Sequence, residues 1–184
     1  MRLVHLALLA LLTPTLAKAD YGAHVGGHFG YGKMGNSSLD ANQSRGIGTF
    51  DLQGMPGIKV YGKFILLGLM LDYRFHSQLS DDNSLSQYGG RSFLLGPGAI
   101  LDFPLFKLLF SWDIRDRHYY SGPDTTYKGS GFHFLFGYKV VGNLCVDLEY
   151  VTARYKSVKI NDDEIGLDDP VKHYNLAFGL SWSF

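Results

Sequence analysis

The chain has 184 residues, of which 17 are basic and 17 acidic, so its formal net charge is zero. Without an excess of positive charge, nothing in the composition calls for a nucleic-acid partner. The length is that of a single domain. Cys145 is the only cysteine, which excludes a framework of internal disulfides.

The N-terminus has the parts of a secretory signal peptide. Arg2 and His5 precede the apolar run Leu6 to Leu12, and the small-residue site Ala17-Lys18-Ala19 follows. The run is far shorter than the roughly 20 apolar residues of a membrane-spanning helix. We therefore expect residues 1–19 to be cleaved on export, leaving a mature domain of residues 20–184.

The mature chain begins with side chains that alternate with a period of two, which is the pattern of a β-strand. Tyr21, Val25 and Phe29 fall on one face, whereas His24 and His28 fall on the other among glycines. A loop is predicted over residues 34–45, which are rich in Asn, Ser and Gly. A second strand is expected from about 49 to 61, a tight turn near 62, and a third strand over 64–76.

The remaining segments repeat this alternation between apolar and polar faces. Strands are predicted over 91–102 and 106–118, then around 132–140 and 144–150, with short turns near 104 and 142. Longer polar loops are expected over 77–90, 120–127 and 156–169. Short and long connections therefore alternate along the chain.

The last twelve residues, His173 to Phe184, carry the clearest alternation. One face has only large apolar or aromatic side chains, and the other has only small or polar ones. A strand that shows apolar side chains to lipid and polar ones to a lumen is what a transmembrane barrel needs. The sequence therefore predicts an all-β fold, a closed eight-stranded antiparallel up-and-down transmembrane β-barrel.

The chain resembles the small eight-stranded bacterial outer-membrane barrels, the group that contains the OmpA membrane domain and OmpX. The resemblance covers the mature chain and includes the terminal residues Gly179, Trp182 and Phe184, which are similar to the assembly signal of that family. It implies a monomer in the bacterial outer membrane, with lipids, lipopolysaccharide and the barrel assembly machinery as partners. A girdle of aromatic residues is expected at the periplasmic rim, formed by Tyr21, Phe64, Phe106, Tyr138, Trp182 and Phe184.

The inward positions carry six acidic and six basic side chains by this assignment. The acids are Asp51, Asp72, Asp102, Asp113, Asp147 and Glu149, and the bases are Lys59, Arg74, Lys107, Arg115, Arg117 and Lys139. An eight-stranded barrel is just wide enough to be filled by side chains, and buried ions need partners. We hypothesise that the cations of the fifth strand reach across to the glycine-rich first and last strands and plug the lumen with ion pairs.

Two groups of residues contain side chains that can bind metals, but a role without a metal is favoured for both. His24, His28 and His133 are all expected to point inward, but no cysteine or carboxylate stands beside them at ligand spacing, so hydrogen-bonded histidines are favoured. The acidic residues Asp162, Asp163, Glu164, Asp168 and Asp169 lack the spacing of a calcium loop. We predict no metal or other cofactor.

Two alternative functions stay open. A lipid A-modifying enzyme would need a nucleophile and a base at the outer rim, where His76, His118 and His173 are expected beside Ser77 and Ser121. The His-x-Ser pattern of the deacylases and the amphipathic N-terminal helix of the palmitoyltransferases are absent, so a non-enzymatic role is favoured.

The other alternative is a narrow, porin-like channel or a transporter that opens sideways to pass small hydrophobic molecules. Pro56 and Pro97 interrupt the second and fourth strands, and proline cannot donate to the ladder. A pair of β-bulges is the favoured explanation. The favoured function is a structural or surface-interaction role in the outer membrane.

Overall fold

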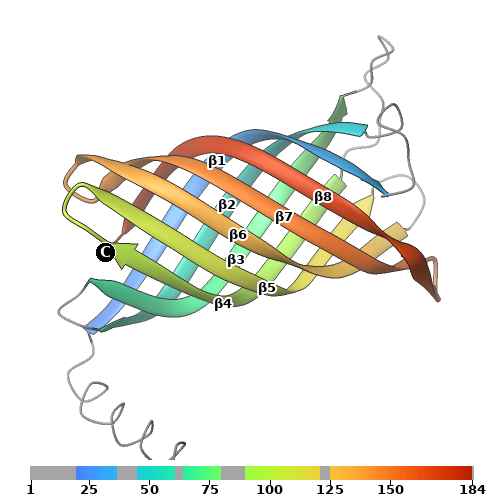
Figure 1. Cartoon of the computed structure of the whole chain (residues 1–184), viewed down its shortest axis with the longest axis horizontal. Helices are drawn as coiled ribbons and strands as arrows, with labels where there is room; N and C mark the ends of the chain where they lie inside the picture. Colours follow the sequence, from blue (N-terminus) through green and yellow to red (C-terminus); the bar gives the residue numbers. More distant parts are fainter. Residues whose placement is uncertain (1–19, 37–44, 61–63, 80–89, 121–124, 184) are drawn as a thin grey trace, which may run out of the picture.

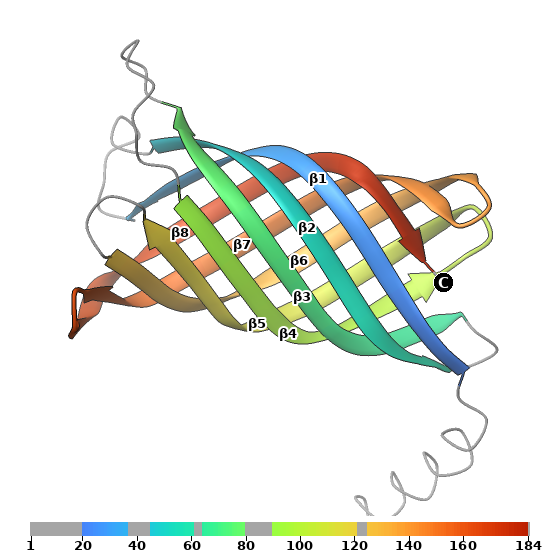
Figure 2. The ribbon, with the colours of Figure 1, turned by 180° about the vertical axis from the view of Figure 1, so that it is seen from behind.

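The computed structural model describes residues 20–36, 45–60, 64–79, 90–120 and 125–183 and forms one closed barrel. Its strands are β1 Asp20–Asn36, β2 Arg45–Val60, β3 Ile65–Leu79, β4 Gly90–Asp102, β5 Phe106–Tyr120, β6 Thr125–Val141, β7 Leu144–Ile160 and β8 Asp163–Ser183. Each strand is antiparallel to its two neighbours, and β8 closes the ring on β1. Figures 1 and 2 show the strands tilted around a single axis. The predicted fold class is confirmed.

Exposure alternates along the strands with the predicted period of two. On β6, Phe132 and Phe134 are 62% and 36% exposed, whereas the intervening His133 and the following Leu135 are buried. Outward-facing aromatic side chains also contact each other across strands, as Phe110 and Phe134 do at 5.0 Å between ring centroids. No helix in the described residues is long and apolar enough to cross a bilayer.

Short turns join the strands at the end of the barrel where the described chain starts and ends. The turn after β4 is closed by a 2.9 Å hydrogen bond from the Phe103 amide to the Phe106 carbonyl. The turn after β6 contains Gly142 with φ of 55°, a left-handed conformation that glycine adopts without a steric penalty. The predicted turns near 104 and 142 are therefore confirmed, and the one near 62 lies outside the described residues.

The prediction of a loop over residues 156–169 is wrong. In the structure β7 and β8 continue to Ile160 and from Asp163, so they form a long hairpin with a turn at Asn161 and Asp162. Asn161 has φ of 55°, which asparagine tolerates better than most residues. The hairpin extends at the end opposite to the C-terminus (Figure 1). Most residues of this hairpin are exposed. Its sequence is therefore polar, and a polar segment of this kind resembles a loop.

One ion pair ties the hairpin to the neighbouring strand outside the apolar part of the barrel. Lys128 of β6 donates to Glu164, and the Ser157 hydroxyl donates to the other oxygen of Glu164 at 2.8 Å. The Lys128 ammonium and the Ser157 hydroxyl lower the pKa of Glu164 from its usual value. The charged carboxylate is thus the form that the extended hairpin favours.

The two prolines behave differently. The pairing of β4 with β5 shifts register between Leu95 and Gly98, so a β-bulge lies at the level of Pro97, but its extra residue is on the facing strand β5. At Pro56 the prediction of a bulge is wrong, since the pairing of β2 with β3 resumes at Gly57 in the register it had at Gly54. Pairing continues on both sides of each proline, and the barrel is closed around its whole circumference.

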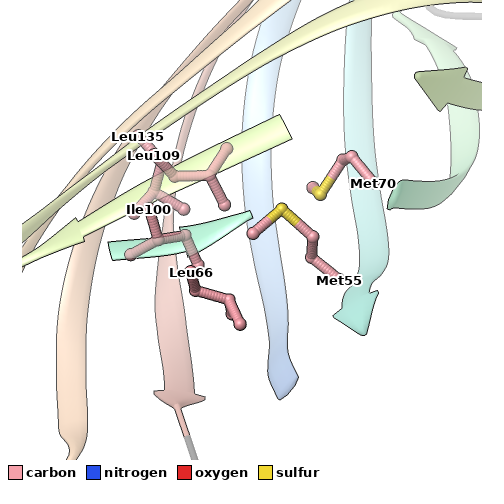
Figure 3. Close-up of a cluster of buried hydrophobic side chains, with 6 residues drawn as sticks. All are labelled: Met55, Leu66, Met70, Ile100, Leu109 and Leu135. Atoms are coloured by element: carbon pink, nitrogen blue, oxygen red, sulfur yellow. The ribbon is translucent and has the colours of Figure 1, made fainter. Parts of the chain in front are cut away.

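Six apolar side chains pack inside the barrel from five strands. Met55, Leu66, Met70, Ile100, Leu109 and Leu135 are at most 5% exposed and form one cluster (Figure 3). The cluster includes residues close to the short turns, such as Leu66 and Leu109. The interior is therefore an apolar core in one part and a charged one in another, as described below.

A glycine substitution tests the close approach of β2 and β3. A Cβ on Gly68 would lie 2.2 Å from the Pro56 carbonyl oxygen, whereas a Cβ on Gly166 would meet nothing within 4 Å. Gly68→Ala should lower the free energy of unfolding by about 1–3 kcal/mol because the strands must move apart. Urea unfolding in lipid vesicles, followed by tryptophan fluorescence, measures this.

Gly166→Ala is the matched control and should change the unfolding free energy by less than about 0.5 kcal/mol. If the two variants unfold at the same urea concentration as the unmodified protein, the register of β2 and β3 described above is wrong.

Candidate functional site

The barrel interior holds most of the charged residues that the sequence placed there. Six carboxylates are buried: Asp51, Asp72, Asp113, Asp116, Asp147 and Glu149, each at most 1% exposed. Arg74 and Lys107 are the fully buried cations among the described residues. Successive side chains of a strand point to opposite faces of the sheet, and these are on the inner face.

Arg74 of β3 is the centre of this group. Its guanidinium donates to Asp72 with Nε 2.8 Å and Nη2 2.5 Å from Oδ2, and Nη2 also donates to Glu149 on β7. The same nitrogen lies 3.9 Å from Asp51 Oδ2. One arginine thus connects strands from opposite parts of the ring, which its planar set of donors makes possible.

His28 of β1 lies between three carboxylates, two of which also face Arg74. Its Nδ1 is 2.8 Å from Asp51 and 2.9 Å from Glu149, and its Nε2 is 3.3 Å from Asp147. Both ring nitrogens face acceptors, so the arrangement suits an imidazolium that donates from each. A Cβ on Gly179 would come within 2.3 Å of the His28 ring, so this glycine leaves the space that the ring occupies.

Lys107 of β5 spans the barrel toward the closing strands. Its ammonium donates to the Ser181 hydroxyl on β8, lies 3.2 Å from His24 Nδ1 on β1, and lies 4.0 Å from Asp147. A Cβ on Gly137 would be 2.7 Å from Lys107 Cε. Small residues on the neighbouring strands therefore leave room for this long side chain.

Arg115 and Arg117 were predicted in the lumen, and both assignments are wrong. The pairing of β5 with β6 shifts register between Asp113 and Asp116, and the extra residue reverses the alternation beyond that point. Arg115 is exposed and Arg117 half-buried, whereas Asp116 and His118 are buried. Asp116 accepts a 3.2 Å hydrogen bond from the Tyr155 hydroxyl.

The other predicted lumen residues lie away from the centre. Asp113 is buried and accepts a 2.7 Å hydrogen bond from Ser111. Lys139 pairs with Asp102 at 2.6 Å near the short turns, where both are partly exposed. Lys59 is half-buried, with its chain over Gly22. These residues border the central cluster rather than join it.

The terminal strand carries two of the three residues assigned to the assembly signal. Trp182 is 40% exposed and pairs with Val25 of β1 and Leu144 of β7. Gly179 pairs with His28 and faces inward. Phe184 lies outside the described residues.

Three histidines form a cluster inside the barrel near its outer end. The sequence predicted their position near the outer rim but not their contact with one another. His76, His118 and His173 come from β3, β5 and β8, and their ring centroids lie 4.6, 5.7 and 6.4 Å apart. All three are buried inside the barrel, and His76 Nε2 is 2.6 Å from the Ser92 hydroxyl. They do not face lipid, which is where the enzyme alternative required them.

Two groups of buried side chains have the ligand types and spacing for a metal ion. One is His28, Asp51 and Glu149, and the other is Asp72, His133 and Glu149. In each group one ligand atom per residue lies within 4.8 Å of the others. The members come from different strands, so no spacing along the sequence reveals them.

The fold is that of the small outer-membrane β-barrels, with apolar side chains outward and a charged interior. Neither a protein-family model nor a curated protein matches the sequence. Among solved structures, the chain is similar to Neisserial surface protein A, with a TM-score of 0.57, 16% identity, and coverage of 90% of this chain and 99% of that one.

The chain is also similar to Ail, the attachment invasion locus protein of Yersinia pestis, with a TM-score of 0.50, 10% identity, and coverage of 90% and 99%. At such identities these likenesses establish the fold alone. They confirm the resemblance to small eight-stranded outer-membrane barrels.

Removal of the central cation should be strongly destabilising. Arg74→Met keeps much of the side-chain volume but leaves Asp72 and Glu149 as buried charges without their main partner. We expect a loss of about 3–5 kcal/mol in the free energy of unfolding, measured by urea titration in vesicles.

Arg115→Met is the matched control, since Arg115 is exposed, and its cost should stay within about 0.5 kcal/mol. Equal effects of the two substitutions would contradict the central position of Arg74.

Proposed function

We propose that this protein resides in the bacterial outer membrane as a β-barrel with a filled, non-conducting interior, and that its role is structural or surface interaction. The observation that supports the location is the outward surface. Large apolar side chains are exposed on seven of the strands, and Phe93, Leu95 and Leu101 on β4 are partly exposed. Exposed apolar side chains spread over every strand fit contact with hydrocarbon on all sides of the barrel.

The packing of the interior supports the filled state. The cluster around Met55 and Leu135 takes up apolar volume, and Arg74, His28 and Lys107 cross the remaining space to partners on other strands. A pore through this region would require breaking several buried ion pairs at once, which is costly. The closed pairing on both sides of Pro56 and Pro97 likewise gives no support to a lateral opening.

The surface-interaction role is assigned to the end of the barrel that carries the long hairpin. Residues 161–166 at its tip are exposed, and acidic side chains dominate there, including Asp162, Asp163 and Glu164. Ile160 and Ile165 are 41% and 52% exposed beside them. A mixed acidic and apolar tip held out from the membrane is suited to contact another molecule, and a buried catalytic group is not needed for it.

A planar-bilayer recording tests the filled interior directly. Purified refolded protein should give no steady ohmic conductance at voltages where a general porin, used as the positive control, conducts. The double variant L109A/L135A removes buried interior volume and should leak more than the unmodified protein. A stable open pore in the unmodified protein would contradict the proposed filled interior.

A further inference from the structure

A second feature of the interior is an imbalance of charge. Among the described residues, six buried carboxylates face two buried permanent cations, Arg74 and Lys107. Even with His28 as an imidazolium, negative charge remains in a region shielded from water. Such charge is stable only when an ion or a proton compensates it.

His133 of β6 lies at the side of this excess charge. It is 1% exposed, and neither ring nitrogen has a hydrogen-bond partner. Asp72 Oδ1 and Asp113 Oδ2 are also buried without a hydrogen bond. Buried polar atoms are nearly always satisfied, so these orphaned atoms around one imidazole point to a ligand that accepts electron pairs from them.

The separations around His133 fit an ion better than hydrogen bonds. Its Nε2 lies 3.6 Å from Glu149 Oε1, and its Nδ1 lies 3.9 Å from Asp72 Oδ2. These distances exceed those of hydrogen bonds. An imidazole gives one nitrogen to an ion, so only one of these two separations can belong to its ligand shell. Two ligands bound to one tetrahedral ion at about 2.0–2.2 Å lie about 3.4 Å apart, close to the Nε2–Glu149 value, and one ligand atom from each of Asp72, His133 and Glu149 lies within 4.8 Å of the others.

We propose that Asp72, His133 and Glu149 form a buried site for a divalent transition-metal ion, with Zn²⁺ as its best representative. One imidazole with two carboxylates is a donor set that Zn²⁺ accepts. The ion compensates two of the excess negative charges. Arg74 donates to Asp72 Oδ2 and Glu149 Oε1, which leaves the second oxygen of each carboxylate without a hydrogen bond. The ion would connect β3 with β6 and β7 as Arg74 connects β3 with β7.

The alternative group around His28 is a poorer site. Both of its ring nitrogens already lie within 3.3 Å of carboxylate oxygens, and Gln53 approaches them at 3.2 Å. An ion there would have to replace an existing set of hydrogen bonds. His133 has no such set to lose.

The test uses the refolded full barrel in detergent, exposed to Zn²⁺ and then desalted. Mass spectrometry of the metal content should find one Zn²⁺ per chain. His133→Asn should lose the bound ion, whereas His24→Asn, which removes an interior histidine outside both candidate groups, should retain it. Gel mobility before and after boiling verifies that each variant is folded.

The contrary results are specific. Absence of Zn²⁺ from the unmodified protein overturns the proposal, as does retention of the ion by His133→Asn or an equal loss in His24→Asn. If His133→Asn does not fold, X-ray absorption of the Zn²⁺-loaded unmodified protein decides. A nitrogen and oxygen shell with scattering from one imidazole supports the site, and a shell without imidazole overturns it.

Discussion

Closure of the hydrogen-bonded ring is the constraint on which the rest of this structure depends. A sheet inside hydrocarbon cannot leave backbone groups unpaired, so β8 must return to pair with β1. Once eight strands close, the interior is narrow, and its volume must be filled by side chains from the inward positions. The period of two then decides which side chains face lipid and which share the confined interior.

The interior divides into parts with different chemistry. The apolar cluster around Leu66 and Leu109 lies toward the short turns, the network around Arg74 follows, and the histidines near His76 lie toward the outer end. Glycines at positions such as 137 and 179 make room for long or ring-bearing partners on neighbouring strands. Side chains of complementary size, rather than of one residue type, fill the interior.

The fold could be predicted because alternation is a local signal, and it survives in every strand. The predictions that were wrong concerned contacts between distant segments or depended on one extra residue in a strand. The bulge between Asp113 and Asp116 reverses the faces of Arg115 and Arg117, and no residue in this run signals it by type. The hairpin at 156–169 was missed because its few apolar residues, such as Val158, Ile160 and Ile165, stand among charged and polar ones, and most of its residues are exposed. The apolar interior cluster was missed because Leu135 stands in a run apolar on both faces.

The interior site was predictable in its members but not in its pairings. Seven side chains were assigned inward from sequence and are buried in the structure: Arg74, Lys107, Asp51, Asp72, Asp113, Asp147 and Glu149. Asp102 is only partly buried, and the buried Asp116 was not assigned inward. Which carboxylate meets which cation depends on the tilt of strands across the ring. Glu149 and Arg74 are 75 positions apart in the chain. They meet only because the sheet closes into a barrel with this strand register.

The most direct measurement is a spin-label scan along β6 in lipid vesicles. Cys145 is first replaced by serine, and labels are placed singly at positions 132 to 138. Collision with oxygen, which concentrates in hydrocarbon, should peak at 132, 134, 136 and 138, and labels at 133, 135 and 137 should be shielded from both oxygen and a water-soluble nickel reagent. High nickel accessibility at the odd positions, or loss of the two-residue period, would contradict a closed and filled barrel.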